Sequence, residues 1–269
     1  MPPDLVGHES RRGNGVSDPP VSHEELAAIV AVLDAYALGL LAPLFLYGPR
    51  PSELGHILRS DHDDSNGFLH VVSRPAIGYQ TKGRRDKAWP VTDVLAACLR
   101  PFLARTAGPL FVKRWVFEEQ AQPAISSATE DVLVREFEDR TAAETARLGK
   151  TPGKERLEQI SEEIWAAAGA VDARDVAREL ERAAEKAGLA HVPTPKDVRH
   201  LVETECEAAR LSQGVIRYLL GHAPGRGDAL VHYNHTGRAV LREQVAILDS
   251  RRQVLIEALA KRSAMTPVA

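Results

Sequence analysis

The chain contains 269 residues, of which 44% are hydrophobic and 26% charged, and its formal net charge is −3 at pH 7. These values are typical of a globular protein with a substantial core, and they exclude a disordered or fibrous chain. The two cysteines, Cys98 and Cys206, are far apart and form no CxxC pair. This spacing excludes a disulfide framework or a zinc ribbon and favours a reducing, cytoplasmic location.

The N-terminal part of the sequence predicts a tail followed by a helix. Residues 1–20 are rich in proline, glycine and charge, so we expect a flexible tail or linker there. The opening stretch MPPDLVGHESRRGNG has no apolar core behind its charges, and a signal peptide is therefore not expected. Ser22 and Glu25 have the spacing of a capping box, which predicts that a helix begins at Ser22.

An apolar run over residues 26–48 is long enough to raise the question of a membrane span. Asp34 lies inside this run, and Pro43 would interrupt a continuous helix. We therefore expect two buried helices rather than a membrane-spanning one, with the second near residues 38–47.

The motif GPRPSEL follows this apolar run. Pro49 and Pro51 restrict the backbone on both sides of Arg50. Ser52 is a suitable cap for a further helix, which we expect to continue through Leu58.

The next part of the chain has β character. After the polar loop SDHDDSNG come three short runs, GFLHVVS, AIGYQTK and KAWPV, each typical of a strand. The segment TKGRRDKAWPV predicts a hairpin with GRRD at its turn. Thr92 is then expected to cap a helix that reaches Pro101 or just beyond it.

From about residue 115 to residue 168 the chain changes to charged, alanine-rich helix with weak apolar periodicity and an internal GKTPGKE break. The stretch from Glu118 to Lys186 holds 17 acidic and 10 basic residues, a local balance of −7, so the rest of the chain carries +4. We interpret residues 115–170 as an inserted helical segment that is loosely attached to the core.

Four more helices are predicted after this insertion. Asp172 is a cap for the first and Gly188 ends it, while Thr194 and Pro195 open the second. The expected fold class is α+β and mainly helical, with one small antiparallel sheet and the helical insertion. The helices are expected in DARDVARELERAAEKAGLA, KDVRHLVETECEAARL, LSQGVIRYLLGH and, as one long final helix, GRAVLREQVAILDSRRQVLIEALAKR.

Several polar residues at the ends of these elements are weak signals when taken singly. Arg50 alone is more often a solvated or capping arginine, and Lys82 alone a solvated turn residue. Arg199 could belong to a surface pair, and His222 could finish a helix C-terminus.

The stretch LVHYNH leaves three interpretations open at this point. Tyr233 could be a core aromatic residue, which is the common case for a single tyrosine. His232 and His235 could form a metal site, although no HExxH motif, cysteine pair or carboxylate lies at ligand spacing. Tyr233 could also be a nucleophile.

Together and in chain order, five motifs resemble the tyrosine recombinases, also called phage-type integrases. They are GPRPSEL with Arg50, TKGRRDKAWPV with Lys82, PKDVRH with Arg199, LLGH with His222 and LVHYNH with Tyr233. The resemblance covers roughly residues 22–112 and 170–260. It implies a catalytic domain of that family over residues 21–269, preceded by the tail and interrupted by the insertion.

The resemblance implies a role for each motif residue in site-specific DNA recombination. Arg50, Arg199 and His222 would bind the phosphate oxygens, because a guanidinium donates bidentately and keeps its proton. Tyr233 would attack phosphorus and form a 3′-phosphotyrosyl link, and Lys82 would protonate the 5′-hydroxyl leaving group. Neither a metal nor another cofactor is implied.

The sequence departs from the family pattern in two places. Lys196 occupies the position that opens the family's HxxR motif, where it could contact the phosphate or take the place of the usual base. The spacing from His222 to Tyr233 is also slightly longer than usual, and its glycines and proline suggest a loop that lets the tyrosine move.

Double-stranded DNA is the partner that the resemblance implies, with no membrane. The apolar final helix could dock into a neighbouring protomer, as part of a homo-oligomer (tetramer) on DNA. Family members usually carry a separate DNA-clamping domain before the catalytic one. The resemblance also implies a cytoplasmic, nucleoid-associated protein that serves a mobile genetic element. The expected backbone contacts are Arg84, Arg85, Lys87, Arg217 and Arg226, with Lys113 and Arg114.

Two alternatives remain beside recombination. A type IB topoisomerase-like enzyme would use the same chemistry to relax DNA without exchanging a defined site. A non-catalytic DNA-binding relative would be indicated by Lys196 as a sign of decay, although Arg50, Arg199, His222 and Tyr233 are all present.

Overall fold

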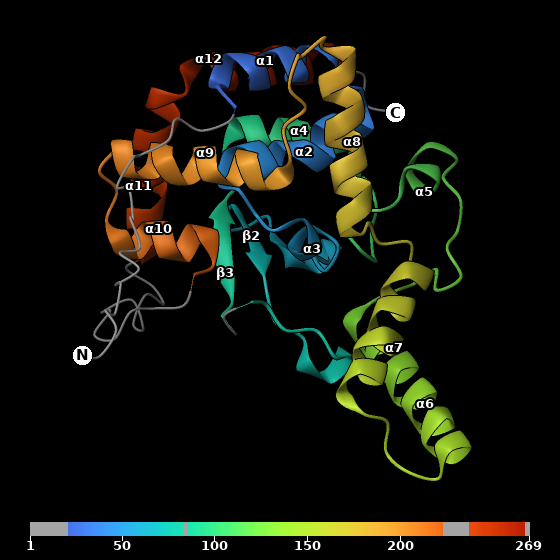
Figure 1. Cartoon of the computed structure of the whole chain (residues 1–269). Helices are drawn as coiled ribbons and strands as arrows, with labels where there is room; N and C mark the ends of the chain where they lie inside the picture. Colours follow the sequence, from blue (N-terminus) through green and yellow to red (C-terminus); the bar gives the residue numbers. More distant parts are fainter. Residues whose placement is uncertain (1–20, 83–84, 223–236, 267–269) are drawn as a thin grey trace, which may run out of the picture.

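The helix α2 (Ala35–Tyr47) lies at the centre of the molecule and is buried along nearly its whole length. The computed structural model describes residues 21–82, 85–222 and 237–266. A helix that is apolar on every face must be covered by other elements. Helices that pack on α2 include α4 (Asp93–Leu103), α8 (Ala173–Lys186), α9 (Pro195–Ala208) and α12 (Gln253–Met265) (Figure 1).

The first helix, α1 (His23–Val32), begins at the predicted capping box. The Ser22 hydroxyl accepts a hydrogen bond from the Glu25 backbone N–H at 3.1 Å, and the Glu25 carboxylate accepts one from the Ser22 N–H at 2.8 Å. This reciprocal pair satisfies two N–H groups that the first turn leaves without helical partners.

The apolar run forms two buried helices, as predicted. The second helix begins at Ala35, earlier than the expected position near residue 38. Asp34 ends the connection after α1 and caps α2, because its carboxylate accepts from the Ala37 N–H at 2.8 Å. Pro43 lies inside α2 rather than at its end. In the described part of the chain, no helix is long and apolar enough to cross a membrane.

The sheet is small and antiparallel, in the order β1 (His62–Asp63), β2 (Phe68–Val71) and β3 (Lys87–Pro90). The runs GFLHVVS and KAWPV contain strands, but AIGYQTK does not. It forms a short 3₁₀ turn, η2 (Pro75–Ile77), and Gly78 follows with a φ of +73°. The partner of β3 is therefore β2, across a long connection, and not the segment before GRRD as predicted. The predicted turn GRRD includes residues 83–84, which lie outside the described residues.

The motif GPRPSEL forms a shorter helix than expected. The helix α3 (Pro51–Leu54) has Arg50 rather than Ser52 at its N-cap and ends before Gly55. Proline is preorganised for the first helical position, because its φ is fixed and its missing N–H would be unpaired there. Pro51 therefore starts α3 two residues earlier than the Ser52 cap predicted.

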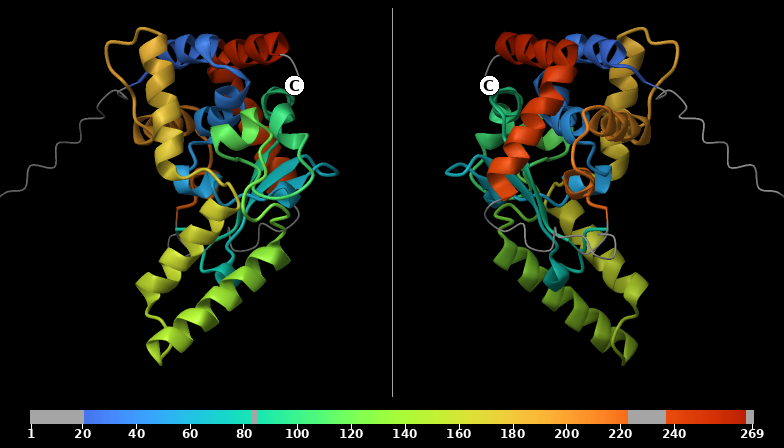
Figure 2. Two further views of the ribbon diagram at one scale, coloured as in Figure 1. Left: turned by 90° about the vertical axis from the view of Figure 1, so that its right-hand side faces the viewer. Right: turned by 90° about the vertical axis from the view of Figure 1, so that its left-hand side faces the viewer.

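The predicted long final helix is divided into α11 (Gly237–Arg251) and α12. Arg252 lies between them with φ −111° and ψ 38°, and its buried guanidinium donates to the Leu46 carbonyl at the end of α2 at 2.6 Å. This contact turns the chain so that α12 packs against α1 and α4 of its own chain (Figure 2). Docking of this helix into a neighbour remains a proposal.

The inserted segment contains α5 (Arg114–Glu118) and an arm of two helices, α6 (Glu130–Leu148) and α7 (Lys154–Ala167), which projects from the body (Figures 1 and 2). The base of the arm is attached to the body through a second buried core, which is separate from the main one. That core consists of Leu58, Ile77, Ile125, Ala128, Leu133, Ile160, Ile164, Trp165, Ala168 and Ala170.

His56 lies beside this second core and makes the stability dependent on pH. Its Nδ1–H donates to the Ser52 carbonyl at 2.6 Å, and its ring stacks on Tyr79 with a centroid distance of 3.7 Å. Burial lowers the pKa of His56 to about 4 from the ordinary 6.5. The unfolded chain therefore binds more protons between these two values, and stability falls as the pH decreases from 6.5 towards 4.

We expect His56 to contribute about 1.4 kcal/mol per pH unit to the decrease in unfolding free energy within this window. The contribution is fully present above pH 6.5, where His56 is neutral in both states. Urea denaturation between pH 4.5 and 7 measures the slope. His56→Phe keeps a ring on Tyr79 but cannot titrate, so its slope should be smaller by that amount, and an unchanged slope would contradict the assignment.

Candidate active site

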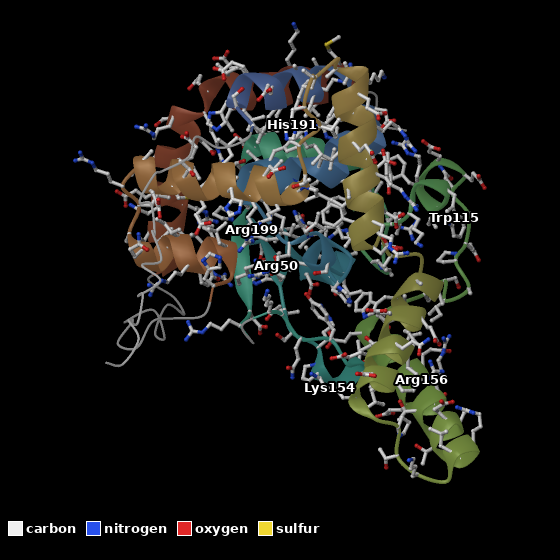
Figure 3. The ribbon with its side chains drawn as sticks, viewed as in Figure 1. Arg50, Trp115, Lys154, Arg156, His191 and Arg199 are labelled. Atoms are coloured by element: carbon white, nitrogen blue, oxygen red, sulfur yellow. The ribbon has the colours of Figure 1, made fainter. Side chains whose placement is uncertain are left out.

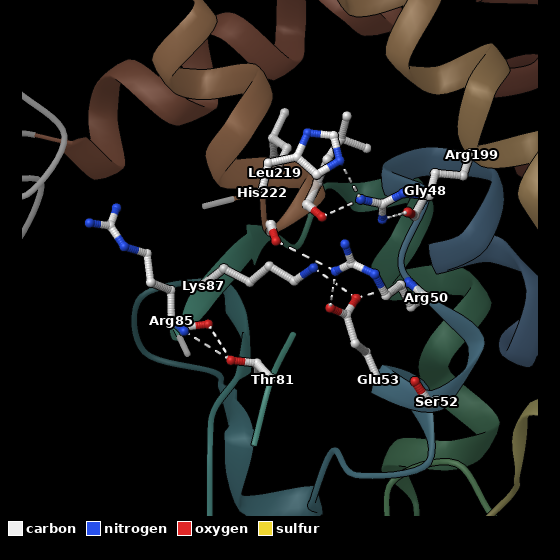
Figure 4. A network of polar contacts seen from close by, with 12 residues as sticks. Gly48, Arg50, Ser52, Glu53, Thr81, Arg85, Lys87, Arg199, Leu219 and His222 are labelled. Atoms are coloured by element: carbon white, nitrogen blue, oxygen red, sulfur yellow. Dashed lines mark hydrogen bonds and ion pairs between the residues drawn. The ribbon is translucent and has the colours of Figure 1, made fainter. Parts of the chain in front are cut away.

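Three of the predicted site residues converge at the centre of the body. Arg50 comes from the start of α3, Arg199 from α9, and His222 from the residue pair after α10 (Gln213–Leu220) (Figures 3 and 4). The Arg199 Nη2 lies 3.0 Å from the His222 Nε2. Residues that are far apart in sequence thus form one cationic cluster.

Both arginines are held by backbone carbonyls. Arg199 donates from Nη1 to the Gly48 carbonyl at 2.6 Å and from Nη2 to the Leu220 carbonyl. Arg50 donates from Nη1 to the Gly221 carbonyl at 3.5 Å. The carbonyls belong to the C-terminal ends of α2 and α10, so these two helices fix where the guanidinium groups lie.

Two glycines make this close approach possible. Gly48 has a φ of +56°, and a Cβ there would lie 3.2 Å from the Arg199 Cα, so a side chain would press against α9. Gly221 has a φ of +65°, and a Cβ there would lie 2.9 Å from the Lys87 Nζ. Only glycine takes this left-handed conformation without steric cost, so both turns depend on it.

The cluster contains a buried ion pair that the sequence did not reveal. The Lys87 Nζ donates to the Glu53 Oε2 at 2.8 Å, and the two side chains are 2% and 3% exposed. Glu53 also accepts from the Arg50 Nη1 at 3.3 Å and from the Arg50 backbone N–H at 2.9 Å. Glu53 therefore joins Lys87 to Arg50 and orients that arginine.

The position of Lys87 corrects the expectation that it contacts the DNA backbone from the surface. Burial lowers the pKa of Lys87 to about 8, and the neighbouring Glu53 opposes this decrease. Its ammonium is committed to Glu53 inside the protein. The sequence did contain one signal for this ion pair, namely a lysine in the otherwise apolar strand KAWP. A lysine buried in such a strand requires a counter-charge nearby.

Arg114 also differs from its expected role in DNA binding. Its guanidinium contacts three carboxylates, those of Asp34 at 2.8 Å, Glu118 at 2.6 Å and Glu179 at 2.6 Å. These contacts offset its positive charge, and they tie α5 to α2 and α8.

His222 is partly exposed at the mouth of the cluster. Burial, and after it the positive charge of Arg199, lowers the pKa of His222 below its ordinary 6.5. The imidazole is therefore neutral at pH 7, and its Nε2 can accept a hydrogen bond from the Arg199 Nη2–H. A phosphate oxygen near this ring would meet a neutral imidazole beside two guanidinium groups.

The remaining predicted site residues lie in different places. Lys82 is exposed near the end of the connection between β2 and β3, and Lys196 is exposed on the first turn of α9, one turn before Arg199. Arg85 and Arg217 line a small hollow together with His222. The predicted residues Arg84, Arg226, His232, Tyr233 and His235 lie outside the described residues.

The chemistry of the described cluster is suited to an anion rather than a cation. Arg50 and Arg199 present guanidinium groups to one small region, and the carboxylate of Glu53 lies behind them, paired with Lys87. Within residues 21–82, 85–222 and 237–266, no group of three or more histidine, cysteine, aspartate or glutamate residues could hold a metal ion. Arginine pairs of this kind are typical of phosphate recognition.

The buried pair gives a prediction about stability. Glu53→Gln leaves the Lys87 ammonium buried without a counter-charge, and we expect it to lower the free energy of unfolding by about 3 kcal/mol. Urea denaturation at pH 7 measures this change. The double variant Glu53→Gln/Lys87→Met removes both charges and should recover much of the loss, and a double variant as unstable as the single one would contradict the pairing.

Comparison with known proteins places the chain in a family. The family model described as "Phage integrase family" matches residues 21–238. Among solved structures, the "Crystal structure of XerA recombinase" is similar at 16% sequence identity, with 93% of this chain and 68% of that chain covered and a TM-score of 0.48. A search of curated proteins found no match. Because the family model covers most of its length, the chain belongs to the phage integrase family.

Proposed function

We propose that this protein is a site-specific DNA recombinase that cuts and rejoins DNA strands through a tyrosine. The observation that supports this most directly is the convergence of Arg50, Arg199 and His222 on one cationic site in a member of the phage integrase family. The site offers hydrogen-bond donors for a phosphodiester, and both arginines are fixed by the protein before any substrate binds.

The two arginines would stabilise the reacting phosphate. A phosphodiester carries its charge on two non-bridging oxygens, and attack on phosphorus adds charge to them. Arg50 and Arg199 donate to these oxygens, and His222 adds a further polar contact. Fixed donors gain most in the transition state, because they need no reorganisation as the charge grows.

Tyr233 would be the nucleophile and Lys82 the general acid. The Tyr233 phenol loses its proton, its oxygen forms a bond to phosphorus, and the bond from phosphorus to the 5′-oxygen breaks. The Lys82 ammonium gives its proton to that departing oxygen. Lys196 lies one turn before Arg199 on α9. It would either contact the phosphate as an ammonium, with the phenol proton passing to water, or receive the phenol proton as a neutral amine.

A trapping experiment tests this function. The protein is incubated with a duplex that carries a nick next to the cleaved bond, so that the released 5′ fragment diffuses away, and the mixture is then denatured in detergent. We expect a covalent protein–DNA adduct, with the DNA 3′-phosphate attached within residues 223–236. Complete absence of an adduct from all duplexes that the protein binds would contradict the proposal.

A second candidate is relaxation of DNA by the same chemistry. It has the same requirement for Arg50, Arg199, His222 and Tyr233, so the site by itself does not favour it. Exchange of strands between two copies of a defined sequence would support recombination, whereas removal of supercoils from any plasmid without exchange would support relaxation. A non-catalytic relative would give neither product.

The wider setting belongs to the same proposal. We infer that the partner is double-stranded DNA and that several copies of the chain bind it as a homo-oligomer (tetramer). The protein would act at the nucleoid and serve a mobile genetic element. Arg85 and Arg217, which line a hollow together with His222, would contact the DNA backbone. Light scattering on DNA of defined length would measure the number of copies.

A further inference from the structure

The segment before Lys82 lies against the arm formed by α6 and α7. At Gly78 the backbone is so close to the arm that a Cβ would lie 3.1 Å from Phe137 of α6 and 3.2 Å from Ser161 of α7. Both helices of the arm therefore contact the chain four residues before the proposed general acid. This contact exists because the segment AIGYQTK forms a turn rather than a strand.

A buried arginine fastens this segment to the arm and to the body. Arg74 is 1% exposed on its side chain, and it donates to both carboxylate oxygens of Asp61, at 2.6 and 2.8 Å. It also donates to the His56 carbonyl at 2.9 Å and to Glu130, the first residue of α6, at 3.1 Å. A guanidinium with this many partners is fixed in place, and it fixes the backbone from which it extends.

An aromatic bridge connects the arm with the segment that leads to Lys82. Trp165 of α7 meets His56 edge-on at a centroid distance of 4.9 Å, and His56 stacks on Tyr79 at 3.7 Å with an angle of 4° between the planes. His56 follows Glu53 by three residues, and Tyr79 precedes Lys82 by three. We refer to Trp165, His56 and Tyr79 as the aromatic bridge.

The bridge is linked to the base of the Lys82 loop by hydrogen bonds. Tyr79 and Arg74 exchange backbone hydrogen bonds of 2.9 and 3.0 Å. The hydroxyl of Thr81 accepts from the Arg85 N–H at 3.0 Å and donates to the Arg85 carbonyl at 2.8 Å, which closes the loop around Lys82. The Ser73 hydroxyl lies 2.9 Å from that of Thr81. Movement of Tyr79 would therefore displace the residues that carry Lys82.

We propose that the arm is a positioning element for the reaction, and that the aromatic bridge holds the Lys82 loop where the lysine can reach the leaving oxygen. This inference rests on the proposed function. Arg199 and His222 are held by the ends of α2 and α10 instead. Damage to the bridge should thus impair proton donation to the leaving group and leave the binding of the phosphate oxygens largely intact.

DNA with sulfur in place of the bridging 5′-oxygen separates these two effects. A thiolate leaves without receiving a proton, so a missing or misplaced general acid no longer slows cleavage. We expect Trp165→Ala to cleave ordinary DNA roughly 10- to 100-fold more slowly than the unchanged protein, in line with the cost of misplacing a catalytic group by about 1 Å. On the sulfur-containing DNA its rate should return to within a few-fold.

Three variants calibrate this measurement. Lys82→Ala should show the same recovery on the sulfur-containing DNA, and Arg199→Ala should stay slow on both substrates. Trp115→Ala removes a tryptophan that is 44% exposed on α5, outside the arm, and should match the unchanged protein. The double variant Lys82→Ala/Trp165→Ala should be no slower on ordinary DNA than Lys82→Ala alone.

Urea denaturation shows whether Trp165→Ala folds. If it does not, Tyr79→Leu replaces it as the variant that damages the aromatic bridge. The Tyr79 hydroxyl has no hydrogen-bond partner among the described residues, so leucine removes the stacked ring without leaving a polar group unpaired. Equal slowing on both substrates by a folded bridge variant, or no slowing on either, would contradict the inference alone. A lack of adduct from the unchanged protein would contradict the proposed function, and the inference with it.

Discussion

Tyr233→Phe is expected to abolish the covalent DNA adduct, with a decrease of at least about 10³-fold in the rate of cleavage. The substitution removes only the phenolic oxygen, which is the atom proposed to form the bond to phosphorus. Phenylalanine offers no nucleophile at that place, while the cationic cluster of Arg50 and Arg199 is unchanged. The adduct is measured on nicked DNA after denaturation in detergent.

DNA binding distinguishes loss of chemistry from loss of recognition. Tyr233→Phe should bind the same duplex with an affinity within a few-fold of the unchanged protein, because the arginines remain. Tyr36→Phe is the matched control, since Tyr36 is a buried core ring that packs on Phe102 and Phe117. An adduct of normal yield from Tyr233→Phe would show that another residue is the nucleophile.

Arg199→Lys is expected to lower the rate of strand cleavage by about 10²- to 10³-fold, although it keeps the positive charge. The Arg199 guanidinium contacts the Gly48 carbonyl, the Leu220 carbonyl and the His222 ring at the same time. An ammonium group is a single compact donor and cannot reproduce this planar arrangement while also meeting a phosphate oxygen. The decrease should appear in single-turnover cleavage with DNA in excess of its dissociation constant.

The same variant needs a check on folding, because the contacts of Arg199 also connect the ends of two helices. Urea denaturation of Arg199→Lys measures the loss of stability, and cleavage is compared where both proteins are folded. Arg182→Lys is a control on α8, where the arginine is 61% exposed and pairs with Glu179. A folded Arg199→Lys protein that cleaves at the normal rate would remove Arg199 from the proposed phosphate clamp.

Local sequence signals placed many of the helices correctly, because each depends on residues close in the chain. The Ser22–Glu25 capping box starts α1, and Asp172 caps α8 by accepting from the Arg174 and Asp175 N–H groups. Caps of this kind satisfy backbone donors within three residues, so their effect can be read from the sequence alone.

The incorrect predictions for the final helix and for AIGYQTK involve contacts between distant residues. The final helix divides because Arg252 binds the Leu46 carbonyl, 206 residues away. AIGYQTK is not a strand because Arg74 is drawn into a buried site with Asp61, and Gly78 meets the arm. Neither contact leaves a periodic pattern near the residues that it controls, so short-range reasoning could not find it.

The sequence by itself determined the helical character of the chain, the main capping residues and the order of the family motifs around Arg50, Lys82, Arg199 and His222. Only the tertiary structure decided that Glu53 and Lys87 form the buried support of Arg50, and that the inserted arm is packed against the segment leading to Lys82. The physical reason is that a buried charge is tolerated only where its counter-charge lies, and folding alone brings such partners together.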